Sequence, residues 1–225
     1  MVPDPSSVRS LFTDLAPSYD CYNRVFSLGL DTLWRKRLVA AVTRIHPQAV
    51  LDVACGSGDV ALALQRALPG AKVSGLDFCA PLLAQAKSRG LRNPVEGDAL
   101  AMPFADCQFD AVTLAFGLRN FSNREKGLRE IFRVLRTGGI FALLEFSPPP
   151  MPWKLFWHFY LFIFMPCVAE ILTRQGDAFR YLARSISQFP SPASVAKELQ
   201  FAGLHWESSL SMSFGLVRLT LCRKT

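Results

Sequence analysis

The sequence lacks the features that would indicate an oxidising compartment or a metal site. Its six cysteines form no Cys-x-x-Cys pair, and no histidine cluster accompanies them. They are Cys21, Cys55, Cys79, Cys107, Cys167 and Cys222. This spacing predicts free thiols in an intracellular protein with no bound metal. The opening residues MVPDPSSVRS lack a basic stretch followed by an apolar one, so we expect no secretory signal and a cytoplasmic location.

A long uninterrupted apolar run is also missing. The segment WKLFWHFYLFIFMPCVAEIL, residues 153–172, is broken by Lys154, His158, Pro166 and Glu170. The runs that remain are shorter than the roughly 18 apolar residues that a membrane-spanning helix needs. We expect this segment to cover an apolar pocket or to touch a membrane surface rather than to cross the bilayer.

Acidic residues are fewer than basic ones, which gives a formal net charge of +7. This excess favours an anionic partner: a nucleic acid, an acidic membrane surface or a charged small molecule. The basic residues are scattered through predicted helices such as 34–37 and 124–136, and solvated helix faces explain them. We therefore expect no nucleic-acid partner.

The apolar segments are short and alternate with helical ones. Strands are predicted at 49–54, 72–77, 94–100, 109–116 and 140–146, and two more within 205–224. This alternation predicts an α/β, Rossmann-like fold: a mostly parallel seven-stranded sheet with helices on both faces and an antiparallel edge. Asp31 is the expected cap of the helix over 32–45, and Gly138-Gly139 the expected end of the helix over 126–136.

A chain of 225 residues that is 50% hydrophobic fits one domain. Within it, residues 1–45 are expected to form an N-terminal helical lid and 46–147 a cofactor-binding core. Residues 148–187 then form an apolar helical insert after the fifth strand, and 188–225 a C-terminal helix and edge strands.

The turn DVACGSG, residues 52–58, lies between a predicted strand and a predicted helix. Glycines let a ligand approach the backbone, and the helix N-terminus adds a positive dipole. The third glycine of the dinucleotide pattern G-x-G-x-x-G is missing, because Val60 and Ala61 stand there. S-adenosylmethionine carries no pyrophosphate and does not need that glycine. The turn therefore favours S-adenosylmethionine, with a nicotinamide-dependent reductase as the alternative.

Acidic residues end three successive predicted strands. We expect Asp52 to bind the ammonium group of S-adenosylmethionine, while N–H groups of the glycine turn bind the carboxylate of S-adenosylmethionine. Asp77 is placed to accept the ribose hydroxyls, and Asp98 to accept the adenine amino group beside the Ala99 N–H. Each aspartate alone could also be a helix cap.

The fourth predicted strand ends in TLAFGLRNFSN, residues 113–123, which puts Arg119 and Asn120 just beyond an apolar run. An isolated arginine there would ordinarily point to solvent. The carboxyl edge of a parallel sheet is also where ligands bind, so both interpretations stay open from these residues alone.

With these motifs placed, the chain resembles the ubiquinone/menaquinone biosynthesis C-methyltransferase family over nearly its whole length. The resemblance rests on LDVACGSGD, GDALAMPF, FGLRN, VLRTGGIFALLEFSPP and FRYLARSI, together with the N-terminal YDCYNRVFSLG. It implies a class I S-adenosylmethionine-dependent methyltransferase that acts on a ring carbon of a demethylated prenyl quinol. The chain departs from the family's usual pattern at three positions. Members often have serine where this chain has Ala115 and glycine or threonine where it has Cys55. They often have asparagine where it has Asp98.

The expected catalytic residues are Arg119, which would stabilise negative charge on a ring oxygen or orient a water, and Asn120, which would hydrogen-bond the ring. The family's cofactor contacts carry over to Ser57, Asp77, Asp98 and Ala99. The full set expected to bind the cofactor is Asp52, Ala54, Gly56, Ser57, Gly58, Asp77, Asp98 and Ala99. The residues expected to contact substrate are Tyr19, Tyr22, Asn23 and Phe116.

The expected partners are a prenylated quinol and, peripherally, a membrane surface; a homodimer and a quinone-biosynthesis complex are both open. The route for the prenyl tail is expected to be lined by Phe156, Trp157, Phe159, Phe162 and Phe164. A methyltransferase for another small lipid or a polyketide, and a non-catalytic protein on the same fold, remain alternatives.

Overall fold

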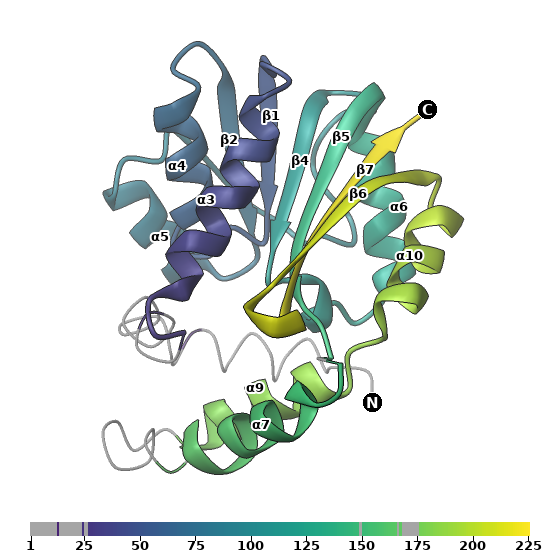
Figure 1. The fold of residues 1–225 in the computed structure, drawn as a ribbon. Helices are drawn as coiled ribbons and strands as arrows, with labels where there is room; N and C mark the ends of the chain where they lie inside the picture. The colour runs from purple at the N-terminus through teal and green to yellow at the C-terminus, as the bar shows by residue number, and fades with distance from the viewer. Residues whose placement is uncertain (1–12, 14–23, 25–26, 149, 166, 168–175) are drawn as a thin grey trace.

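Seven strands pair into one sheet in this computed structural model, which describes residues 13, 24, 27–148, 150–165, 167 and 176–225 (Figure 1). The strand order is β3-β2-β1-β4-β5-β7-β6. The strands are β1 (Ala49–Val53), β2 (Lys72–Asp77), β3 (Asn93–Glu96), β4 (Phe109–Ala115), β5 (Leu135–Phe146), β6 (Leu204–Met212) and β7 (Val217–Lys224). Strands β1 to β5 run parallel, and β7 pairs antiparallel with both β5 and β6. The predicted fold class is confirmed.

Helices cover both faces of the sheet, as the near-continuous apolar strands require. One face packs against α3 (Leu30–Thr43), α4 (Asp59–Ala67) and α5 (Ala80–Ser88), and the other against α6 (Arg124–Val134) and α10 (Pro192–Phe201). The two hydrophobic clusters are separated by the sheet: Val50, Ala142 and Leu144 belong to one, and Leu51 and Leu143 to the other.

A third layer lies beyond the end of the sheet. It contains α7 (Trp153–Phe159), the π-helical turn η3 (Tyr160–Phe164) and α9 (Gly176–Ser187). Figure 1 shows α7 and α9 together below the sheet, at the edge where the parallel strands end. The 3₁₀ turn η2 (Leu118–Asn120) contacts α9 at this edge. No helix in the described ranges is both long enough and apolar enough to cross a bilayer.

Three local predictions are wrong. Asp31 is not the cap of α3: Gly29 caps it in a left-handed conformation, and Asp31 lies in the first turn, where it accepts a hydrogen bond from Ser27 Oγ at 2.8 Å and pairs with Arg35. The third strand ends at Glu96, so Asp98 lies in the following loop. Helix α6 stops at Val134 rather than at the glycines, because Leu135 already pairs with Phe109 in the sheet, and this tertiary pairing overrides helix propensity.

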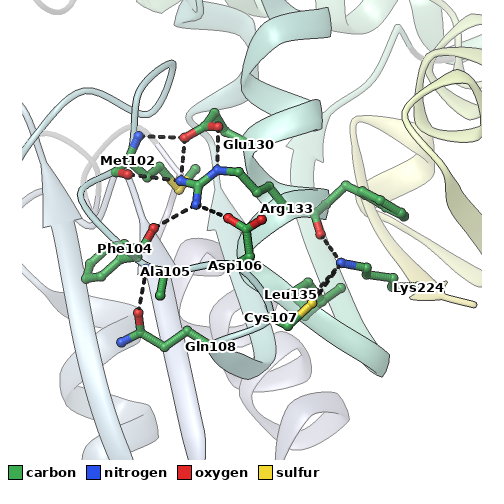
Figure 2. A network of polar contacts seen from close by, with 11 residues as sticks. Met102, Phe104, Ala105, Asp106, Cys107, Gln108, Glu130, Arg133, Leu135 and Lys224 are labelled. Carbon is green, nitrogen blue, oxygen red and sulfur yellow. Dashed lines mark hydrogen bonds and ion pairs between the residues drawn. The ribbon is translucent and has the colours of Figure 1, made fainter.

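The loop after β3, residues 97–108, is held by Arg133 of α6 (Figure 2). The Arg133 guanidinium donates to the Glu130 carboxylate at 2.7 and 2.8 Å and to Asp106 Oδ1 at 2.8 Å. It also donates to the carbonyls of Phe104 at 2.7 Å and Met102 at 3.0 Å. All five N–H groups of the guanidinium are therefore used, which fixes this loop, and with it Asp98 and Ala99, against α6.

We expect Arg133→Met to lower the free energy of unfolding by about 2–3 kcal/mol, because it removes the five hydrogen bonds of the guanidinium and with them the ion pairs to Glu130 and Asp106, and leaves the Phe104 carbonyl without a donor among the described residues. Arg129→Met on the same helix is the control. Arg129 makes an exposed pair with Glu125, which is worth about 0.5 kcal/mol or less. Urea unfolding of both variants measures the difference, and equal losses would contradict the role of Arg133.

Candidate functional site

The glycine turn after β1 has the backbone that its sequence requires. Ala54, Gly56 and Gly58 have positive φ angles of 52°, 54° and 88°. A Cβ on Gly58 would lie 2.9 Å from Ala86 Cβ, so a side chain there would both strain the backbone and collide with α5. Ser57 is buried, and its carbonyl accepts from Arg89 Nη1 at 3.0 Å. The turn is thus a preformed backbone cradle at the N-terminus of α4, which can receive an anionic group.

Asp77 joins this turn to the end of β2. Its Oδ2 accepts from the N–H of Gly56 at 2.7 Å, and its Oδ1 accepts from the N–H of Cys79 at 2.8 Å. Burial raises the pKa of Asp77, against the lowering effect of hydrogen bonds from the Cys79, Gly56 and Phe78 N–H groups. Each carboxylate oxygen keeps a second lone pair. The arrangement fits a ligand with neighbouring hydroxyls, such as the ribose of S-adenosylmethionine.

Asp52 lies in β1 beneath the same turn and is only 2% exposed. Its Oδ1 accepts from Thr113 Oγ1 of β4 at 2.6 Å. Burial raises the pKa of Asp52 to about 7, although the hydrogen bonds from Thr113 and from the Ala61 N–H oppose the shift. The side chain therefore supports the turn and α4 from below, and its contact with a bound ammonium stays a prediction.

Asp98 and Ala99 lie on the loop that Arg133 holds. Asp98 is exposed, and its Oδ1 accepts from the Leu100 N–H at 2.8 Å, while Ala99 is buried. Because β3, β2 and β1 are neighbours in the sheet, the turn, Asp77 and this loop lie at the ends of three adjacent strands. The structure brings the predicted cofactor residues to one edge, and their contacts with the cofactor stay predictions.

Arg119 does not point into bulk solvent. Its side chain is 9% exposed, and its Nη1 lies 2.8 Å from Oε1 of Glu145, whose side chain is 4% exposed. The guanidinium carbon lies 5.1 Å from the centre of the Phe146 ring. The Nε of Arg119 is buried and has no hydrogen-bond partner among the described residues. One edge of the guanidinium is therefore paired, and a further donor is left for a ligand.

Phe116 and Gly117 shape the chain where β4 ends. Phe116 has a φ of 58°, and its N–H donates to the Leu144 carbonyl at 2.7 Å. A Cβ on Gly117 would lie 2.7 Å from Leu114 Cδ1 and 2.9 Å from Ala54 Cβ. The glycine therefore lets the FGLRN segment pack closely against Ala54 of the glycine turn, and a larger residue at position 117 would prevent this contact. A left-handed phenylalanine is an uncommon conformation that is typical of functional sites.

Asn120 is held from the apolar insert. The hydroxyl of Tyr181, on α9, donates to Asn120 Oδ1 at 3.1 Å. Burial raises the pKa of Tyr181, and the nearby charge of Arg119 opposes the shift. With Oδ1 occupied by this donor, the amide NH₂ of Asn120 is the group left to bind a ligand oxygen.

An apolar cavity adjoins Arg119. It encloses about 940 Å³, part of it open to solvent, between α3, the ends of β4 and β5, and the insert. Phe116 lines it, and so do Trp34, Phe146, Phe156, Trp157 and Tyr160. The contact of Phe116 with substrate stays a prediction. The Nε1 of Trp157 is buried and, like Arg119 Nε, has no partner among the described residues. The cavity thus combines aromatic walls with two unsatisfied donors.

Several predicted residues are not brought to this cavity. Phe159 and Phe164 are about half exposed and do not line it, nor does Phe162, whose ring stacks on that of His158 with 4.7 Å between the ring centres.

Tyr19, Tyr22 and Asn23, and most of the predicted lid, lie outside the described residues.

Reasoning from the sequence missed Glu145 and Tyr181. The signal for Glu145 was an acid ending the apolar run IFALLEF, and for Tyr181 the motif FRYLARSI.

The model of the ubiE/COQ5 methyltransferase family matches residues 1–224. The chain belongs to the ubiE/COQ5 methyltransferase family. This methyltransferase is 41% identical to the demethylmenaquinone methyltransferase of Thermus thermophilus, over 93% of this chain and 97% of that one. It is 34% identical to the ubiquinone/menaquinone biosynthesis C-methyltransferase UbiE of Geobacter sulfurreducens, over 94% and 86% of the two chains. Membership favours methyl transfer over the nicotinamide-dependent reductase.

Solved structures agree on the fold of this methyltransferase. The [4+2]-cyclase SpnF superposes with a TM-score of 0.72 at 17% identity, covering 100% of this chain and 97% of that one. A SAM-dependent methyltransferase of Thermotoga maritima, described as a possible histamine N-methyltransferase, gives 0.68 at 16% identity, over 96% and 99% of the two chains. S-adenosylmethionine is the cofactor expected for this methyltransferase, and the cradle formed by the glycine turn and Asp77 fits it.

The pKa of Asp52 gives a pH-dependent stability. The folded protein keeps the Asp52 proton up to about pH 7, whereas the unfolded chain loses it near pH 4. Between these values the unfolded state binds fewer protons, so this group makes stability fall as pH rises. Asp52→Asn keeps a neutral side chain throughout. We expect the free energy of unfolding of the variant, relative to that of the wild type, to rise by up to about 4 kcal/mol between pH 4 and pH 8. Urea unfolding across this range tests it, and parallel pH profiles for the two proteins would contradict it.

Proposed function

We propose that this methyltransferase transfers a methyl group from S-adenosylmethionine to a ring carbon of a demethylated prenyl quinol, converting demethylmenaquinol to menaquinol, the equivalent ubiquinone precursor, or both. The observation that carries the proposal is the buried, partly unpaired Arg119 guanidinium in the wall of an aromatic cavity beside the cofactor turn. A quinol ring is flat and apolar and has two ring oxygens, which matches aromatic walls and two unsatisfied donors.

The reaction requires electron density on the ring, because an aromatic carbon is a weak nucleophile. When bound, S-adenosylmethionine would supply an electrophilic methyl group on a sulfonium sulfur and would leave as the neutral thioether S-adenosylhomocysteine. The proton of the methylated ring carbon would pass to water as the ring becomes aromatic again. Arg119 can donate to the ring oxygen beside the reacting carbon and stabilise it as negative charge develops. The Glu145 carboxylate fixes the guanidinium and balances its charge in the resting state, and Tyr181 leaves the Asn120 NH₂ free to donate. The cavity excludes water and aligns the ring, which lowers the entropic part of the barrier.

We expect Arg119→Met combined with Glu145→Gln to lower kcat for methylation of a short-tailed demethylmenaquinol at least about 100-fold, the typical loss when one oxyanion donor is removed. The double change leaves no unpaired buried charge, so folding is better preserved than in Arg119→Ala. The dissociation constant for S-adenosylmethionine, measured by calorimetry, should change less than about threefold.

Arg124→Met is the matched control, because Arg124 pairs with Glu198 away from the cavity. Retained turnover in the double variant would remove Arg119 from the mechanism. Cells lacking the protein should accumulate a quinone one methyl lighter, and an unchanged quinone profile would overturn the substrate class.

The apolar insert supports peripheral membrane contact. Leu155 is 74% exposed, and Phe156, Phe159, Ile163 and Phe164 are each about half exposed. Phe156 also lines the cavity, as do the exposed Leu28 and Leu30. The cavity mouth is therefore continuous with an exposed apolar face, and the prenyl tail of the substrate could remain in the lipid. The net charge of +7 favours an anionic membrane surface. Self-association and assembly with other proteins stay predictions.

The variant Leu155→Asp/Phe159→Asp should bind vesicles of phosphatidylcholine and phosphatidylglycerol at least about tenfold more weakly, because each side chain gives up roughly 1.5–3 kcal/mol of burial. Phe201→Asp is the control: Phe201 is 85% exposed on α10, away from the insert. Vesicle co-sedimentation measures both. Equal binding by all three proteins would exclude the insert as the contact.

A further inference from the structure

A second groove lies on the face of the sheet that α10 covers, and the proposed methyl transfer does not use it. It encloses about 640 Å³, part of it open to solvent. Leu143, Glu145 and Ser147 reach it from every second position of the chain at the end of β5, and Arg218 and Thr220 do the same from β7. The rest of the wall is mostly apolar and includes Phe189, Pro190, Pro192, Val195, Leu199 and Trp206.

Arg218 brings a charge into this groove that no carboxylate balances. Its Nη1 donates to Ser209 Oγ at 2.8 Å, and it forms no ion pair with any residue in the described part of the chain. Glu145 lies directly opposite Arg218 in the β5–β7 register, but the Glu145 carboxylate pairs with Arg119 instead. The groove is therefore complementary to one negative charge.

Two buried polar atoms of the groove have no partner among the described residues. They are Arg218 Nε and Ser147 Oγ. Ser147 is only 4% exposed, and its backbone N–H is already used, since it donates to the Leu216 carbonyl at 2.8 Å. Buried polar groups without partners are uncommon in folded proteins. An acceptor that entered the groove could satisfy both Arg218 and Ser147.

We propose that this groove binds a small aromatic carboxylate. The carboxylate accepts from the Arg218 guanidinium, whose planar fork suits two parallel hydrogen bonds, and from the Ser147 hydroxyl. The ring packs against Trp206 and Phe189. One unpaired cation matches a monoanion, whereas a dianionic phosphate would carry an excess charge next to Glu145. Phe146 lines both this groove and the Arg119 cavity, and Glu145, which lines the groove, pairs with Arg119, so the site adjoins the Arg119 centre.

The probe is 2-naphthoate, compared with the uncharged 2-naphthamide, which has the same ring. NMR spectra of the arginine Nε–H groups report on the full-length protein, and the Arg218 resonance is assigned by its loss in Arg218→Gln. We expect 2-naphthoate to shift the Arg218 resonance in a saturable way and to bind at least tenfold more tightly than the amide. A saturable shift of the Arg119 resonance alone, or no shift of Arg218, would overturn the proposal.

Calorimetry on variants gives a second test. Arg218→Gln should bind 2-naphthoate at least tenfold more weakly than the wild type. Arg223→Gln, on the same strand, removes an arginine that pairs with Glu207 outside the groove, and its affinity should equal that of the wild type. Should Arg218→Gln fail to fold, the comparison of acid and amide on the wild type decides. Equal affinities for acid and amide would rule out the carboxylate site.

Discussion

The buried ion pair between Arg119 and Glu145 organises the functional edge of the sheet. Arg119 follows β4 and Glu145 lies near the end of β5, so the 2.8 Å contact joins two neighbouring strand ends. A guanidinium buried at this depth would be costly without a counter-charge. Glu145 therefore makes it possible for a cation to remain in the wall of an apolar cavity, with one donor still unsatisfied and Asn120 and Tyr181 held beside it.

Two binding tasks are expected at different parts of one edge of the sheet. The cradle that we expect to hold the cofactor is built from the turn after β1, from Asp77 and from the loop that Arg133 holds to α6. The apolar cavity is built from α3, the ends of β4 and β5 and the insert, and its mouth opens on exposed aromatic residues. Polar recognition and apolar recognition thus meet only along the edge where the parallel strands end, as is usual for open α/β sheets.

Much of the candidate site could be predicted from the sequence, because its signals are local. The turn DVACGSG between a strand and a helix, and an arginine directly after an apolar run, can be read within a few residues of one another. Glu145 and Tyr181 could not be assigned in this way. Glu145 is 26 positions from Arg119, and Tyr181 is 61 positions from Asn120, and pairings over such separations depend on how the strands and the insert are arranged in space.

The sequence by itself determined the order of strands and helices, the cofactor turn and the family, because apolar periodicity and glycine placement act over short distances. The tertiary structure decided what each polar group does. It placed Asp52 beneath the turn, gave Arg119 a partner, and ended α6 at Val134 because Leu135 is taken by the sheet. It also left Arg218 without a counter-charge, since strand register put Glu145 opposite Arg218 while η2 brought Arg119 to the same carboxylate.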